Sequence, residues 1–184
     1  MSNFRGPNPV DSVGSLHSLG SAEPSDQEIV KSNLKFVYWN VQGWTNCDKG
    51  AVELGVRTDD IRAQAISVLQ PDVLAMSETW LQNNESVKVD NYKWVGNNRK
   101  ETHQRALRGS GGVGLLINNS LTTKYDIQVL DDSHEDILWV LLEVIRDEDR
   151  EDSLIVGVCY LPPFGSSRGG NPDAFFDSMI DCLH

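Results

Sequence analysis

The sequence predicts an α/β fold, and three observations support this. Hydrophobic residues make up 39% of the 184 residues and charged residues 23%, as in a chain that folds around a core. Apolar β-branched runs alternate with a segment of helical spacing. These runs are all much shorter than the roughly 20 residues of a membrane-spanning helix, so no membrane segment is expected. A chain of this length is expected to form one domain with a tail.

Residues 1–31 are expected to be a flexible tail. They contain six Ser, three Gly and three Pro and few large apolar side chains, so they cannot bury enough surface to offset the entropy of ordering. They also lack the apolar stretch of a secretory signal peptide. The three cysteines are odd in number and widely spaced, which is typical of reduced thiols. We therefore expect an intracellular protein, nuclear or cytoplasmic, that is not secreted.

Strand and helix signals alternate in the first half of the chain. Residues 34–41 are β-branched and aromatic and end at Gly43, which predicts a buried strand. Thr58 is the expected N-cap of a helix that stops at Pro71, and residues 72–76 form a second strand. The residues expected on the apolar face of this helix are Ile61, Ala65, Val68 and Leu69. The succession of strand, helix and strand indicates a βαβ-like unit.

Strand signals dominate the second half. Residues 113–117 and 121–125 flank a turn of Asn and Ser and are expected to form a hairpin. Residues 137–145 and 154–161 are two further strands, for which antiparallel pairing is the simplest connection. Asn171, followed directly by a proline, is the expected N-cap of a final helix.

The net charge of −11 is unevenly distributed. Ten acids and two arginines give residues 131–152 a net charge of −8, whereas residues 88–108 carry +4 with aromatic side chains between the basic ones. Such a basic segment fits the backbone of a nucleic acid, and it equally fits an ordinary solvated loop. The candidate DNA-binding residues are Lys93, Arg99, Lys100, Arg105 and Arg108.

Four short motifs follow one another along the chain. They are Trp39-Asn40-Val41-Gln42-Gly43, Ser77-Glu78-Thr79-Trp80-Leu81, Gly111-Gly112-Val113-Gly114-Leu115-Leu116-Ile117 and Cys159-Tyr160-Leu161-Pro162-Pro163. Their order and spacing resemble the endonuclease/exonuclease/phosphatase superfamily. The wording of the last three looks most like the endonuclease domain of LINE-type, non-LTR retrotransposons. The resemblance covers residues 34–184, and four motifs in order are far more specific than one.

The resemblance implies a fold and a chemistry. The fold is a two-sheet α/β sandwich, of which this chain would be the N-terminal part. The chemistry is hydrolysis of DNA phosphodiester bonds with Mg²⁺ or Mn²⁺, which oxygen ligands suit. By the same resemblance Glu78 is a metal ligand, Asn40 belongs to the same metal and phosphate cluster, and the Tyr160 hydroxyl contacts the scissile phosphate. Taken singly, these residues also fit a surface carboxylate, a turn asparagine and a packed strand tyrosine.

The chain departs from the family pattern at its end. The family has an Asp-x-Asn motif and a C-terminal Asp-His pair, whereas here Asn171-Pro172-Asp173 is reversed and His184 follows Leu183. We therefore expect residues 32–184 to be a truncated domain with exposed apolar faces and open strand edges. Activity would require a C-terminal half or a reverse transcriptase region in a longer chain. The alternatives are a non-catalytic remnant and, less favoured, a small-molecule phosphoesterase.

Overall fold

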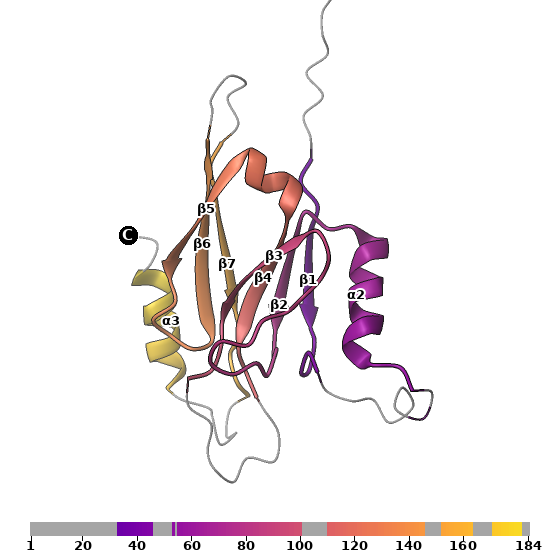
Figure 1. Ribbon diagram of the computed structural model, residues 1–184. Helices are drawn as coiled ribbons and strands as arrows, with labels where there is room; N and C mark the ends of the chain where they lie inside the picture. Colours follow the sequence, from indigo (N-terminus) through magenta and orange to yellow (C-terminus); the bar gives the residue numbers. More distant parts are fainter. Residues whose placement is uncertain are drawn as a thin grey trace, which may run out of the picture. The chain divides into compact units, whose positions relative to one another are not determined.

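The computed structural model describes residues 33–45, 53, 55–100, 110–145, 152–163 and 171–181. The strands are β1 (Phe36–Asn40), β2 (Val73–Ser77), β3 (Tyr92–Asn97), β4 (Val113–Asn118), β5 (Tyr125–Asp131), β6 (Ile137–Val144) and β7 (Leu154–Cys159) (Figure 1). The helices are α2 (Thr58–Leu69), the 3₁₀ helix η1 (Asn119–Thr123) and α3 (Pro172–Asp181). None of the helices described is long and apolar enough to cross a membrane.

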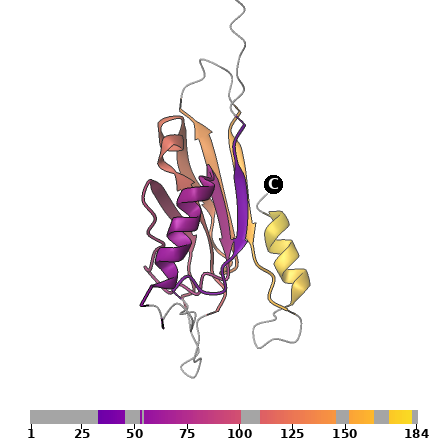
Figure 2. The same ribbon diagram turned by 90° about the vertical axis from the view of Figure 1, so that its right-hand side faces the viewer.

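The strands form two sheets. The first has the order β1-β2-β4-β3, in which β1 and β2 are parallel and the other pairs are antiparallel. The second has the order β5-β6-β7 and is antiparallel throughout. Figure 2 shows α2 (purple) and α3 (yellow) on opposite sides of the two sheets. The α/β class, the two-sheet arrangement and the parallel β1-α2-β2 unit predicted from the sequence are confirmed.

Two apolar layers hold the sheets and α2 together. The layer between the sheets consists of alternate residues of β2, β4, β6 and β7, as the two-residue period of a strand requires. Its fully buried members include Val73, Val113, Leu115, Ile117, Leu138, Val140 and Leu142. The layer between α2 and the first sheet includes Ile66, Leu74, Met76 and Leu116. β2 and β4 contribute to both layers and are therefore buried on both faces.

Helix α2 differs from its prediction in two respects. Its N-cap is Arg57, and Thr58 is already the first helical residue. Its buried residue is Ile66, whereas the side chains expected to face the core at positions 61, 68 and 69 are exposed. Apolar residues are spread around this helix, so their spacing alone did not identify the face that packs on the sheet. Arg62 and Ala63 lie on that face together with Ile66.

The predicted hairpin of residues 113–117 and 121–125 is wrong. β4 pairs with β2 and β3, and most of the second segment is the 3₁₀ helix η1. The turn expected at Asn118 is present, because its side chain accepts a hydrogen bond from the Ser120 amide at 2.9 Å. This turn sends the chain to the other sheet, where β5 begins at Tyr125. The antiparallel pairing of β6 with β7 is confirmed.

The outer strands carry exposed apolar side chains, as expected from the sequence. Phe36 and Tyr38 are 50% and 60% exposed, although they lie on the face of β1 that is continuous with the layer between the sheets. β7, the nearest strand of the opposite sheet, contacts β2 and β4. The layer between the sheets is therefore densely covered at β2 and β4 and open at β1.

Candidate active site

Six segments meet at one end of the two sheets, which we call the site rim. β1 and β2 both end there because they are parallel, and β4 begins there because it runs the opposite way. In the second sheet β6 begins and β7 ends at the same rim, which lies at the bottom of Figure 1. The segments of the site rim are residues 40–44, 77–81, 97–100, 110–112, 134–136 and 159–163.

Asn40 and Glu78 are brought together at the site rim. Asn40 is the last residue of β1, and Glu78 follows the last residue of β2. The Asn40 side-chain amide Nδ2 donates a hydrogen bond to Glu78 Oε1 at 3.2 Å. The Asn40 Oδ1 accepts one from the Gln42 amide, also at 3.2 Å. The asparagine thus fixes the direction of the carboxylate while its own rotation is restrained by the following turn.

The backbone around Glu78 has an unusual conformation. Glu78 and Trp80 have φ angles of 52° and 59°, a region that costs energy for residues with a side chain. Hydrogen bonds on both sides hold this conformation. The Gly43 amide donates to the Glu78 carbonyl at 2.7 Å, and the Thr79 amide donates to the Gly112 carbonyl at 3.1 Å. The loop that presents Glu78 is therefore clamped between the end of β1 and the turn before β4.

The glycines of the motifs are required by close packing. A Cβ added at Gly43, where φ is 89°, would overlap the ring of Trp80. At Gly112, where φ is 77°, it would lie 2.7 Å from the Thr79 hydroxyl oxygen. Gly114 lies against the ring of Trp94. These contacts confirm the interpretation of the Gly111–Gly114 segment as turn and packing positions.

Arg62 supports the site and was missed by the sequence analysis. From α2 its guanidinium donates to the carbonyls of Val41 at 2.9 Å and Trp44 at 2.6 Å, and also to the carbonyl of Gly43. Burial lowers the pKa of this guanidinium from its ordinary value, and the nearby Asp59 carboxylate opposes the shift. The charge persists at neutral pH because an arginine pKa starts far higher. Arg62 thus fastens the turn that contacts the Glu78 carbonyl.

Tyr160 lies at the site rim on the second sheet. It follows the last residue of β7, is partly buried, and packs against the apolar layer between the sheets. Its amide donates to the Asp136 carbonyl at 2.9 Å. The Asp136 carboxylate accepts a hydrogen bond from the Gly112 amide at 3.2 Å. Asp136, another residue that the sequence analysis did not single out, therefore connects the end of β7 to the turn beside Glu78.

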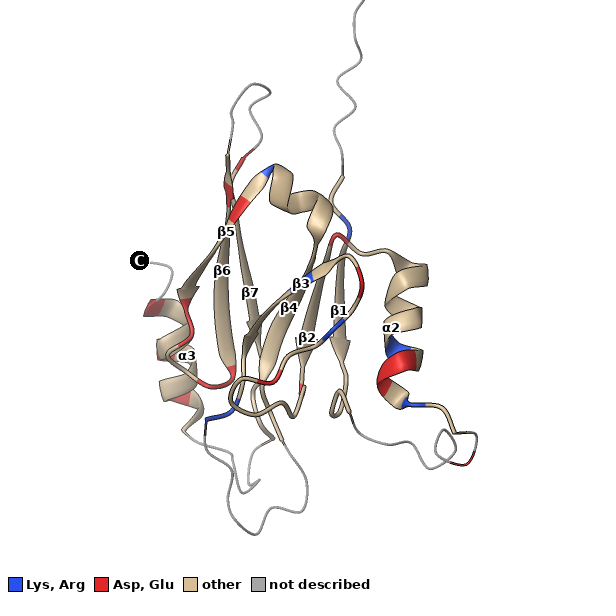
Figure 3. Cartoon of the chain, in the orientation of Figure 1, with Lys and Arg blue, Asp and Glu red and all other residues tan. Residues whose placement is uncertain are grey.

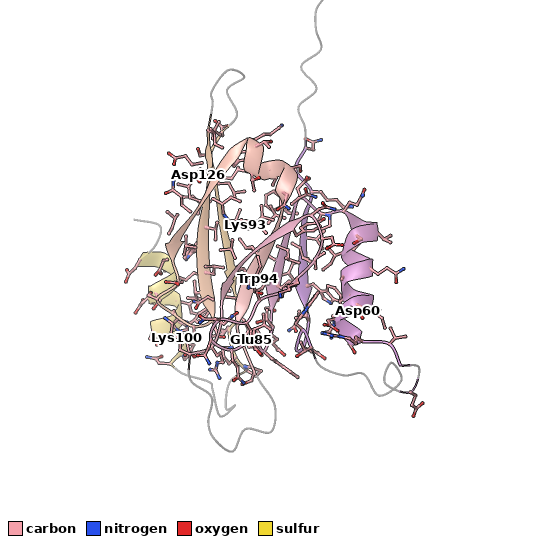
Figure 4. The ribbon with its side chains drawn as sticks, in the orientation of Figure 1. Asp60, Glu85, Lys93, Trp94, Lys100 and Asp126 are labelled. Carbon is pink, nitrogen blue, oxygen red and sulfur yellow. The ribbon has the colours of Figure 1, made fainter. Side chains whose placement is uncertain are left out.

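The structure separates the candidate DNA-binding residues. Lys93 pairs with Ile117, which lies four residues along β4 from the site rim, or about 13 Å at the rise of a strand. Arg99 and Lys100 lie at the rim itself, where the Arg99 amide donates to the Leu81 carbonyl at 3.3 Å. Figure 4 labels Lys93 on the middle of the sheet and Lys100 near the rim. Arg105 and Arg108 fall outside the described residues.

Acidic neighbours modify this basic surface (Figure 3). Arg99 has an 18% exposed side chain, and its Nε lies 3.4 Å from Glu135 Oε2. Part of its charge is therefore offset within the protein. The Lys100 side chain is exposed and available to a phosphate.

The donors at the site rim suit a hard divalent cation. Glu78 supplies a partly exposed carboxylate, and Asn40 supplies an amide oxygen beside it. Within the described ranges, no group of three or more His, Cys, Asp and Glu side chains could hold a metal ion. Mg²⁺ is commonly bound through one or two carboxylates, with waters and substrate phosphates completing its shell. The residues present fit that mode, with Glu78 as the protein ligand.

Comparisons with known proteins show the fold. No family model and no curated protein matches the sequence. Among solved structures, the chain is similar to an AP endonuclease from Leishmania major, with a TM-score of 0.60 and 21% sequence identity. The similarity covers 82% of this chain and 48% of the AP endonuclease, so the chain spans about half the length of that protein. The chain shares the fold of this part of an AP endonuclease, an endonuclease/exonuclease/phosphatase fold.

Proposed function

We propose that residues 33–184 form part of a divalent-metal-dependent endonuclease that hydrolyses DNA phosphodiester bonds. The observation that carries the proposal is the Asn40–Glu78 hydrogen bond at the ends of two parallel strands, in a fold shared with an AP endonuclease. The wording of the motifs around Glu78, Gly112 and Tyr160 favours the LINE-type retrotransposon class, whose endonuclease nicks the target DNA. Such an enzyme acts inside the cell, where its DNA target is found.

Each site residue has a role in this proposal. Glu78 binds Mg²⁺ or Mn²⁺, and Asn40 holds the carboxylate in the direction that its hydrogen bond defines. The bound ion offsets negative charge on the phosphoryl oxygens and orients water. The Tyr160 hydroxyl donates to the scissile phosphate, where a fixed donor stabilises the charge that develops during reaction. Arg99 and Lys100 lie nearest the cleaved strand, and Lys93, Arg105 and Arg108 contact the DNA backbone further away.

The proposal requires a further part of the site. Hydrolysis needs a general base for the attacking water. We assign it to a segment of a longer chain or to a partner, which would meet the site rim beside Glu78 and Tyr160. The 48% of the AP endonuclease that this chain covers leaves room for such a segment.

A second candidate function is a non-catalytic remnant that binds metal or DNA weakly. One observation favours it. In the part of the chain that the structure describes, Glu78 is not joined by two further His, Cys, Asp or Glu side chains that could share a metal ion with it. The two candidates differ in catalysis and agree on metal binding at Glu78.

Metal binding and plasmid nicking test the proposal together. Mn²⁺ binding to the 184-residue chain is followed by electron paramagnetic resonance, and nicking is assayed in Mg²⁺ with an EDTA control. Glu78→Gln should weaken Mn²⁺ binding about tenfold or more, because it removes the charged ligand. The matched control is Glu143→Gln, which removes an exposed carboxylate from β6 and should leave binding unchanged.

The outcomes separate the candidates. Metal-dependent nicking that Glu78→Gln abolishes supports the endonuclease. Mn²⁺ binding at Glu78 without nicking, by this chain or by a longer one, supports the remnant. Mn²⁺ affinity equal in the wild type and Glu78→Gln would contradict both.

A further inference from the structure

Asp136 is a buried carboxylate between the two halves of the site rim. It immediately precedes β6 and is 4% exposed. Its Oδ1 accepts a hydrogen bond from the Gly112 amide at 3.2 Å, and its main-chain carbonyl accepts one from the Tyr160 amide at 2.9 Å. Its own amide donates to His134 Nδ1 at 3.2 Å. One residue therefore contacts the turn before β4 in the first sheet and the end of β7 in the second.

The contact with Gly112 continues to Glu78. The Gly112 carbonyl accepts from the Thr79 amide at 3.1 Å, and the Gly111 carbonyl accepts from the Trp80 amide at 2.9 Å. Thr79 and Trp80 directly follow Glu78, whose φ of 52° needs support from its surroundings. The turn that supports the Glu78 loop is thus itself fastened to the second sheet by the Asp136 side chain.

A carboxylate in this position has a clear cost. Its neighbours in the layer between the sheets are apolar, and removing a carboxylate from water is unfavourable unless hydrogen bonds compensate. Hydrogen bonds to an ionised acceptor are stronger and more directional than those between neutral groups. Apolar packing holds two sheets together without fixing the position of one turn, whereas the bond from Gly112 to Asp136 does so.

We propose that Asp136 is a positioning residue that fixes the Glu78 loop relative to Tyr160. Its side chain sets the place of the Gly111–Gly112 turn, and its main chain sets the place of Tyr160. The consequence for catalysis rests on the proposed endonuclease function. The positioning itself is a property of the folded chain and can be measured without metal or DNA.

Amide hydrogen exchange of the 184-residue chain tests the positioning. Asp136→Ala should speed exchange at Gly112, Thr79 and Trp80 about tenfold, because a lost bond to a charged group lowers the cost of local opening by at least that factor. Exchange in the centre of β2 should stay the same. Asp136→Asn keeps an acceptor oxygen in the same place and should restore most of the protection. Asp126→Ala is the matched control, since it removes an exposed carboxylate from β5.

Two results would overturn the inference. One is unchanged exchange at Thr79 and Trp80 in Asp136→Ala. The other is equal acceleration throughout β2, which would show that Asp136 only stabilises the fold. Failure of the proposed function is recognised separately, as Mn²⁺ affinity that does not depend on Glu78. In an active longer chain, Asp136→Ala should lower kcat about tenfold to a hundredfold with little change in KM, the effect of a displaced catalytic group.

Discussion

Strands β2 and β4 are buried on both faces, whereas β1 and β7 lie at the edges of their sheets. Every residue of β2 except Ala75 is buried, whereas Phe36 and Tyr38 of β1 and Ile155 of β7 are half exposed. The site draws on both kinds of strand. Glu78 follows a central strand, while Asn40 and Tyr160 lie at the ends of edge strands. The difference indicates that hydrogen bonds, and not core packing alone, must keep these residues in register at the site rim.

The largest expected effect is a contrast between one central and one edge side chain. Leu116→Ala, in β4, should lower the free energy of unfolding by about 2–5 kcal/mol, because it leaves a cavity in the layer beneath α2. Phe36→Ala, in β1, should cost less than about 1 kcal/mol, because half of that side chain is already in water. Urea unfolding measures both. Similar losses for the two variants would contradict the comparison.

The next effect concerns the turn after β1. Arg62→Met should lower the free energy of unfolding by about 2–3 kcal/mol, because it leaves carbonyls of the Val41–Trp44 turn without their charged donor. Arg62→Lys should recover only part of the loss, since an ammonium group cannot reproduce the planar fork of a guanidinium. Arg57→Met, which changes an exposed arginine at the start of the same helix, is the control. If that variant is equally destabilised, the turn contacts are not the cause.

Periodicity predicted the strands but not every packing partner. β2, β4, β6 and β7 are short apolar runs bounded by polar turns, so their positions follow from local sequence. The pairing of β4 was mispredicted because a turn at Asn118 is compatible with either a hairpin or a crossing to the other sheet. The core face of α2 was mispredicted because Ile61 and Val68 suggested a stripe, while the sheet meets the side with Arg62 and Ile66.

The candidate site was only partly visible in the sequence. Asn40 and Glu78 stand in motifs, and the structure places them in contact. Arg62 and Asp136 stand in no motif, and their partners are main-chain groups at distant positions. Main-chain partners are the same whatever the residue type, so no sequence pattern marks such contacts. A charged residue within an otherwise apolar segment was the available signal in both cases.

A smaller effect should come from the hydrogen bond that joins β1 to β2. The Tyr38 hydroxyl lies 2.7 Å from the hydroxyl oxygen of Ser77, which is fully buried. Tyr38→Phe should cost about 0.5–1.5 kcal/mol, because it leaves the Ser77 hydroxyl without this partner. Ser77→Ala and the double variant complete a cycle that isolates the pair. A coupling energy near zero would mean that this bond does not contribute to holding the edge strand.

The smallest effect is expected at the start of α2, on the surface of the protein (Figure 3). The hydrogen bond from Arg57 lowers the pKa of the Asp59 carboxyl below its ordinary value, and partial burial opposes the shift. The pair therefore stabilises the folded state above the unfolded pKa of about 3.9, and this contribution is lost as the pH falls through the lower folded value. It should amount to a few tenths of a kcal/mol, roughly the worth of a surface ion pair. Urea unfolding between pH 7 and pH 3 should show a slightly shallower loss of stability for Asp59→Asn than for the wild type. A difference above about 1 kcal/mol would place more of the stability on the helix surface than the buried centre of β2 and β4 allows.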